Sequence, residues 1–249
     1  MEVADVDVAR VARLLGDQSR AAMLTALLDG RAYPAAALAQ VAGIGRPAAS
    51  EHLQQLVSAG LIEVFQQGRH RYHRITRAEV AHAIEALAAI APPVPVRSLK
   101  QSTTARRLGV ARTCYDHLAG RAGVALRSIM LDHGILTAMT SRGTDGQGTL
   151  LEISEDGAGR IASLGIDLGG AASRRRRLVV DCLDWTERTP HLAGSLPAAL
   201  LTTMIDQGWV VDRGKRRIDV PVGGWAQLQL GLGCSGTCHP STTFTMPGG

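Results

Sequence analysis

The stretch from Gly45 to Thr76 constrains the fold of this chain more than any other part of the sequence. Its apolar residues recur at the spacing of a helix that buries one face. These positions are Ala49, Leu53, Leu56, Val57 and Gly60. Gly60 follows the periodic run, where a helix commonly ends on a left-handed residue. The residues from Leu61 to Phe65 then predict a strand, which turns at Gln67-Gly68 and returns through residues 69–75.

The outer face of this predicted helix is polar. It carries Arg46, Pro47, Ser50, Glu51, Gln54 and Ser58. The returning strand adds three arginines and two histidines around one tyrosine. Short polar and basic side chains on an exposed helix and hairpin suit contact with base edges and phosphates. The segment therefore predicts a DNA recognition helix followed by a β-wing.

The residues upstream of this helix complete a known arrangement. A helix is predicted over residues 22–28, with Asp17 or Ser19 in the preceding segment as its N-cap and Asp29-Gly30 at its end. Tyr33-Pro34 opens a short helix that runs to Ala42, and Gly43-Ile44-Gly45 is the turn to the next helix. Helix, short helix, tight turn, longer helix and wing together predict a winged helix-turn-helix.

On these residues the chain resembles the ArsR family of bacterial repressors. The resemblance covers about the first 90 residues, through the segments LLGDQSRAAML, LAQVAGIGRPAASEHLQQLVSAGLI and GRHRYHRI. It implies a homodimer that binds double-stranded DNA. It also implies that the predicted helix over residues 78–91 pairs across the dimer through Val80, Ala83, Ile84, Leu87 and Ile90. The residues expected to contact DNA are Arg46, Pro47, Ser50, Glu51, Gln54, Gln67, Arg69, His70 and Arg71.

The second half of the chain contains an internal repeat. Residues 115–136 align without gaps on residues 189–210, and the two segments share the sequence His-Leu-Ala-Gly. Gly60, Gly134 and Gly208 are evenly spaced, and each follows a predicted helix. We therefore predict a mainly α fold with small β-wings (α+β), in which two degenerate winged-helix-like units follow the first domain. The expected divisions are a domain over 1–95, a linker over 96–110, units over 111–170 and 171–233, and a flexible tail over 234–249.

The aligned helices of the repeat carry side chains that are poorly suited to hydrogen-bond with base edges. At the outward positions they offer Val124, Ser128, Ala198 and Thr202. Two basic runs, at 174–177 and 215–217, could contact the phosphate backbone, but we interpret them as solvent-exposed surfaces. This half also resembles a C-terminal extension of some ArsR-type regulators, which implies effector sensing or oligomerisation.

Metal sites of the kind found in the family are incomplete in this sequence. The helix ending at Ala42 has no cysteine, and His82 with Glu85 matches only half of a second family site. Cysteine, aspartate and histidine form a paired pattern in the repeat. Its members are Cys114, Asp116, His117, Cys182, Asp184 and His191. They could converge, but the repeat also explains the histidines as structural positions, so we expect no metal and no cofactor.

Other function classes are disfavoured. No Gly-rich phosphate loop, Gly-x-Ser-x-Gly elbow or His-Glu-x-x-His motif is present, and Gly143–Gly148 lies in a predicted wing loop, so we expect no enzyme. Cys234, Cys238 and His239 belong to a Gly- and Ser-rich tail. The N-terminus reads as an amphipathic helix and no apolar run reaches bilayer length, so we expect a cytoplasmic protein.

The net charge of +5 favours a polyanionic partner. Our sequence-based hypothesis is a ligand-responsive repressor that binds a palindromic operator as a homodimer. Two alternatives remain open at this point: a tandem winged-helix module that binds proteins, and a metal-responsive repressor.

Overall fold

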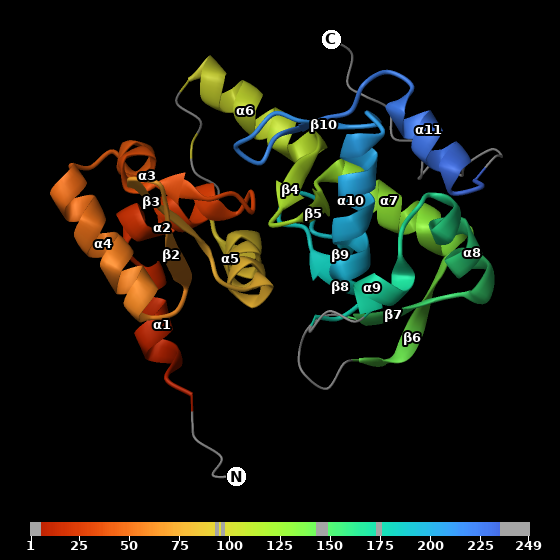
Figure 1. The fold of residues 1–249 in the computed structure, drawn as a ribbon, viewed down its shortest axis with the longest axis horizontal. Coiled ribbons are helices and arrows are strands. Elements are labelled where there is room, and N and C mark those ends of the chain that lie inside the picture. The colour runs from red at the N-terminus through yellow and green to blue at the C-terminus, as the bar shows by residue number, and fades with distance from the viewer. Residues whose placement is uncertain (1–5, 93–94, 96–97, 143–148, 173–175, 235–249) are drawn as a thin grey trace. The chain divides into compact units, whose positions relative to one another are not determined.

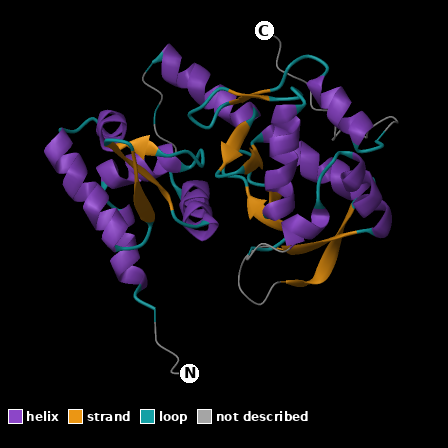
Figure 2. Ribbon diagram, in the orientation of Figure 1, coloured by secondary structure: helices purple, strands orange, loops and turns teal. Residues whose placement is uncertain are grey.

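The computed structural model describes residues 6–92, 95, 98–142, 149–172 and 176–234. The chain divides into two compact units, residues 1–84 and 85–249. Small antiparallel sheets lie among helices in both (Figure 2). Within the described residues, no helix is both long and apolar enough to span a bilayer.

The first unit is a winged helix-turn-helix (Figure 1). In chain order it contains α1 (Val8–Leu15), α2 (Gln18–Leu27), β1 (Tyr33–Pro34), α3 (Ala35–Ala42), α4 (Arg46–Ser58), β2 (Ile62–Gln67), β3 (His70–Ile75) and the start of α5 (Ala78–Ile90). Helices α2, α3 and α4 pack through fully buried aliphatic side chains, among them Met23, Leu38 and Leu56. Of the two N-cap candidates, Asp17 and Ser19, the structure has Asp17, whose carboxylate accepts the N–H of Arg20 at 2.9 Å. The sheet order is β1-β3-β2, so β1 adds a strand that the sequence did not predict.

The three evenly spaced glycines end helices in the same way. Gly60, Gly134 and Gly208 have φ angles of 68°, 66° and 70°. In each case the glycine N–H donates to the carbonyl three residues earlier, and the next N–H donates to the carbonyl five residues earlier. This is the Schellman arrangement, which glycine favours because it has no Cβ. The prediction that each glycine stops a helix is confirmed.

The second unit contains the end of α5 and a longer series of elements. These are α6 (Leu99–Val110), β4 (Arg112–Cys114), β5 (His117–Ala119), α7 (Arg121–Asp132), β6 (Leu136–Arg142), β7 (Thr149–Ile153), α8 (Glu155–Ser163), α9 (Leu168–Ala172), β8 (Val180–Leu183), β9 (Pro190–Ala193), α10 (Ser195–Asp206), β10 (Val211–Asp212), β11 (Ile218–Asp219) and α11 (Gly224–Gly231). Strands β6-β7-β8-β9 form a four-stranded sheet, while β4-β5 and β10-β11 are separate hairpins.

The sequence repeat is visible in this unit. Helices α7 and α10 each span 12 residues, and each lies between two hairpins. The glycines that precede them, Gly120 and Gly194, have positive φ angles of 75° and 119°. A Cβ at these positions would lie 2.9 Å and 2.5 Å from backbone carbonyl oxygens, so only glycine fits.

Several expectations for this half differ from the structure. The predicted linker over 96–110 is helical from Leu99, and the two compact units divide inside α5 rather than near residue 95. The repeats over 111–170 and 171–233 share one aliphatic core, to which α7 and α10 both contribute. A hairpin, not a helix, precedes α7 and α10, so the classification as winged-helix-like units stays a prediction. We predicted that Cys234 belongs to a flexible tail, but it is buried and its N–H donates to the Gln229 carbonyl. Cys238 and His239 lie outside the described residues.

A buried charge network joins α5 to both repeats. The Arg112 guanidinium is fully buried and lies 3.1 Å from the Asp184 carboxylate and 3.4 Å from that of Glu85. Arg112 also stacks on the Trp185 ring, with its guanidinium carbon 4.8 Å from the ring centroid. Arg216 forms a second ion pair with Glu85. Buried carboxylates are tolerated here because each has a guanidinium partner.

We expect Arg112→Ala to lower the free energy of unfolding of the second unit by about 3–5 kcal/mol, because it leaves the buried Asp184 carboxylate without its guanidinium partner. All three tryptophans, Trp185, Trp209 and Trp225, lie in this unit, so their fluorescence in a urea titration reports its unfolding. The control is Arg213→Ala, which removes the exposed pair with Asp219 and should change the free energy by less than about 1 kcal/mol. Equal losses in the two variants would contradict the role assigned to Arg112.

Candidate nucleic-acid interface

Helix α4 keeps one face open to solvent. Ala49, Leu53 and Leu56 form its buried face. The nine residues predicted to contact DNA, on α4 and on the β2–β3 hairpin, are all exposed. They are Arg46, Pro47, Ser50, Glu51, Gln54, Gln67, Arg69, His70 and Arg71.

The N-terminus of α4 is arranged to meet a negative charge. The N-cap is Gly45, which offers no side-chain hydrogen bond, and Pro47 occupies the first turn. The partial positive charge of the helix end is therefore not offset by a capping oxygen. Arg46 adds a full positive charge at the same end.

A groove lies between the outer face of α4 and the wing. It has a volume of ≈ 350 Å³, and α4 contributes Ser50, Gln54 and Val57 to its lining. Strand β3 contributes Arg71 and His73, which are two residues apart and therefore on one face of the strand. The structure thus brings together Ser50, Gln54 and Arg71 of the predicted set.

The remaining wing residues lie at the end of the hairpin or on its other face. Gln67 pairs with His70 next to the turn, which Gly68 and Arg69 form. Tyr72 stacks on Phe65 with ring centroids 6.0 Å apart. Arg74 forms an ion pair with Glu63 and lies over the Phe65 ring, so its charge is already engaged within the wing.

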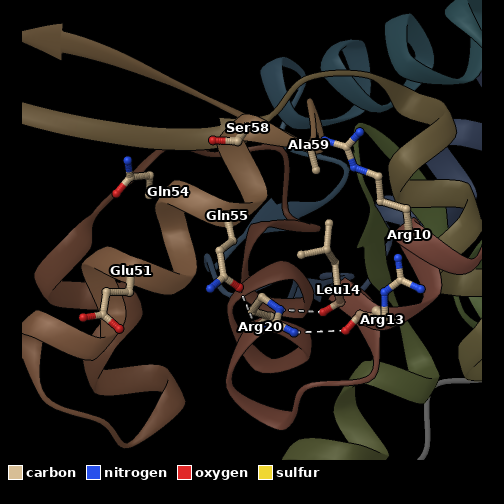
Figure 3. A pocket seen from close by; sticks show the side chains of 9 residues that line it. All are labelled: Arg10, Arg13, Leu14, Arg20, Glu51, Gln54, Gln55, Ser58 and Ala59. Atoms are coloured by element: carbon tan, nitrogen blue, oxygen red, sulfur yellow. Dashed lines mark hydrogen bonds between the residues drawn. The ribbon is translucent and has the colours of Figure 1, made fainter.

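A second recess lies on the other side of Gln54, between α1 and α4 (Figure 3). Its volume is ≈ 730 Å³. Arg10 and Arg13 extend from α1 on one side, and Glu51 and Gln54 stand opposite them. Neither arginine was predicted from the sequence to belong to this surface. Their spacing of three residues on an amphipathic helix was the signal that could have identified them.

The Arg20 side chain links the two helices that line this recess. Its guanidinium donates to the carbonyls of Leu14 at 2.7 Å and Arg13 at 3.0 Å, and so caps the end of α1. It also donates to the Gln55 side chain at 2.8 Å. The arginine therefore fixes α1 against α4, and this places Arg10 and Arg13 beside the outer face of α4.

His73 gives the groove a pH-sensitive side chain. Burial lowers the pKa of His73, and the nearby Arg71 lowers it further, although a backbone contact with Tyr33 opposes both. Because the folded protein favours the neutral ring, the contribution of His73 to stability is present above its ordinary pKa of 6.5 and is lost as the pH falls below it.

We expect an NMR titration of the full chain to give His73 a pKa below 6.5, with the His73→Asn spectrum identifying its signal. The fall in thermal midpoint between pH 7.5 and pH 5.5 should be smaller in His73→Asn than in the unmodified chain, because the variant has no ring to protonate there. A His73 pKa above 6.5, or an equal fall in both proteins, would refute this account.

Known proteins match this chain over both of its units. A family model described as a helix-turn-helix domain matches residues 15–64. The uncharacterized HTH-type transcriptional regulator YdfF of Bacillus subtilis (strain 168) is 40% identical over 211 residues, which are 85% of this chain and 90% of that protein. This chain belongs to the HTH-type transcriptional regulators. Since the match with YdfF extends far beyond residue 84, the second unit is shared with that regulator.

Other relatives match about a third of this chain. The HTH-type transcriptional regulator CmtR of Mycobacterium tuberculosis (strain ATCC 25618 / H37Rv) is 34% identical over 83 residues, 33% of this chain and 70% of that protein. Among solved structures, the transcriptional repressor BigR from Xylella fastidiosa is 28% identical and matches 35% of this chain and 88% of that chain, with a TM-score of 0.32.

The two pairs of candidate metal ligands have different surroundings in this regulator. Glu85 is buried in ion pairs with Arg112 and Arg216, so the pair His82 and Glu85 does not offer a free carboxylate. Cys114 and His117 instead meet Cys182 and His191 in the second unit. Contact with the Cys182 thiol and burial raise the pKa of Cys114 to about 12.

Proposed function

We propose that this regulator is a homodimeric repressor that binds a palindromic DNA operator and releases it when a ligand binds to the second unit. The observation that carries the proposal is the exposed polar face of α4, which shares a groove with Arg71 of the wing. An α-helix fits the major groove of B-DNA, where base pairs present distinct donor and acceptor patterns. Two copies of α4 would read half-sites about 10 base pairs apart.

The exposed residues fall into two roles by chemistry. Arg46, Ser50 and Gln54 are placed to read base edges, because arginine pairs with guanine and glutamine pairs with adenine through two hydrogen bonds. Glu51 is suited to accept from the amino group of cytosine. Arg69, His70 and Arg71, with Gln67 beside them, are suited to contact phosphates. Pro47 fixes the first turn of α4.

We expect Gln54→Ala and Arg69→Ala to affect DNA binding in different ways. Gln54→Ala should change the preferred base at one position of each half-site, with a loss of about 1–3 kcal/mol on the best sequence. Arg69→Ala should weaken binding to all sequences and lower the slope of log affinity against log salt by about one for each phosphate that it no longer neutralises. Selection of bound DNA from a random pool, followed by affinity measurement at several salt concentrations, checks both.

Arg74→Ala is the matched control for the wing, because the Arg74 guanidinium is already paired with Glu63. It should leave both the base preference and the salt slope unchanged. If Gln54→Ala and Arg69→Ala lose affinity equally for specific and random DNA, α4 is not the reading helix.

Exposed apolar side chains support a second copy of the chain as partner. Helix α1 has no buried residue, and its Val8 is 68% exposed. On α5, Ile90 is 79% exposed and Leu87 is 46% exposed. An isolated chain gains nothing from apolar side chains held in water, whereas a symmetric dimer buries them against their equivalents.

We expect Ile90→Glu to dissociate the dimer, because it would bury two unpaired carboxylates across the symmetry axis. Sedimentation equilibrium at several protein concentrations measures this directly. Val222→Glu, at a fully exposed position of the second unit, is the control and should leave the dimer intact. A dimer that withstands Ile90→Glu would show that α5 lies outside the interface.

A further inference from the structure

Four side chains with metal-binding atoms converge inside the second unit. They are Cys114, His117, Cys182 and His191, and one ligand atom from each lies within 4.8 Å of all the others. Cys114, His117 and His191 are fully buried, and Cys182 is 8% exposed. The cluster lies among the residues of 85–249, apart from the recognition helix and wing.

The repeat explains why these four side chains meet. Cys114 lies opposite His117 in the hairpin β4–β5, and Cys182 lies opposite His191 in the hairpin β8–β9. Side chains directly opposite each other on antiparallel strands stand on the same face, about 5 Å apart. Strands β5 and β9 are also in contact. Each repeat therefore supplies one thiol and one imidazole, and the packing of the two hairpins joins the pairs.

The two imidazole rings point the same nitrogen into the cluster. Nε2 of His117 and Nε2 of His191 lie 3.2 Å apart. Tetrahedral zinc with Zn–N bonds of about 2.0–2.1 Å would separate two nitrogen ligands by about 3.4 Å. The observed spacing therefore leaves the nitrogen atoms close to the positions that one ion would require.

The opposite ring nitrogens face carboxylates. Nδ1 of His117 lies 3.3 Å from the carboxylate of Asp116, which is itself paired with Arg176. Nδ1 of His191 lies 3.3 Å from Oδ2 of Asp184, although it makes no hydrogen bond in the structure. Metal-bound histidines commonly turn their second nitrogen towards a carboxylate, which fixes the ring and raises its basicity.

The charges of this region balance when a divalent cation is present. Two thiolates neutralise a divalent ion, while Arg112 offsets Asp184 and Arg176 offsets Asp116. Binding would release to solvent the two thiol protons and any proton held by the two imidazole rings, because metal ligands must be deprotonated. Two sulfur and two nitrogen ligands in a compact group favour tetrahedral Zn²⁺ over harder cations such as Mg²⁺ or Ca²⁺.

We propose that Cys114, His117, Cys182 and His191 form a closed Zn²⁺ site that ties the two repeats of the second unit together. Four protein ligands leave no open position for substrate or water, which is the arrangement of structural rather than catalytic zinc. Asp116 and Asp184 are positioning residues that orient the two histidines. The site is independent of the proposed DNA contacts.

The first test is the metal content of the full chain, made without a histidine tag and purified with a reducing agent. Elemental analysis should find one zinc per chain. After removal by a chelator, cobalt(II) should restore one equivalent, with the ligand-field bands of a tetrahedral ion and charge-transfer bands from thiolates. Reduced protein that takes up neither ion, or a cobalt spectrum without thiolate bands, would overturn the proposal.

The second test assigns the ligands. Cys114→Ser with Cys182→Ser should remove the bound zinc, whereas Cys234→Ser, at a buried cysteine outside the cluster, should retain it. Asp116→Asn should keep the site but weaken zinc binding by about 10–100-fold. Zinc that survives the double substitution, or that is lost only with Cys234, would place the metal elsewhere and refute the assignment.

A disulfide between Cys114 and Cys182 is the competing arrangement, and peptide mapping distinguishes it from a zinc site. The two thiols could instead form a disulfide, with the histidines joined by an N–H···N hydrogen bond. Peptide mapping of the protein under non-reducing conditions would then find Cys114 linked to Cys182, and thiol titration of the reduced chain would not change on adding zinc. Protection of two thiols by one equivalent of zinc is the result expected from the proposed site.

Discussion

The second unit depends on one carboxylate. Asp184 is fully buried, and it accepts the N–H of Gly120 at 2.6 Å and the guanidinium of Arg112 at 3.1 Å. Its other oxygen accepts the hydroxyl and N–H of Thr186. Burial alone would raise the pKa of Asp184, but contacts with His191 and Arg112 hold it well below its usual value. Because a buried carboxylate is stable only when such partners are in place, both repeats must be assembled before this charge is satisfied.

The same contacts connect the hairpins of the repeat to α5. His191 lies beside Asp184, Asp184 binds Arg112, and Arg112 reaches Glu85. Glu85 lies on the helix that exposes Leu87 and Ile90. Contacts therefore run from the hairpins of the repeat to α5, the helix that we propose to form the dimer.

Local signals made the first unit predictable from sequence. The apolar period of α4, the left-handed glycine at Gly60 and the turn at Gln67-Gly68 each depend on residues a few positions apart. Contacts between residues far apart in the sequence were harder to predict. The Ser- and Thr-rich segment that forms α6 has no strong helix signal, and nothing local shows that Arg112 is buried. The paired cysteines and histidines were visible as a pattern, but their convergence depends on how two hairpins pack.

The same kind of packing distinguishes α4 from its counterparts. α4 buries only three residues, whereas α10 buries six, including Leu196 and Met204. On α7 the Arg127 guanidinium is held by the Asp181 carboxylate at 2.6 Å and 2.8 Å, so it is not a free cation. A helix that enters the major groove must leave one face uncovered. Only α4 among these three helices keeps such a face, and this supports DNA reading by the first unit and a supporting role for the repeats.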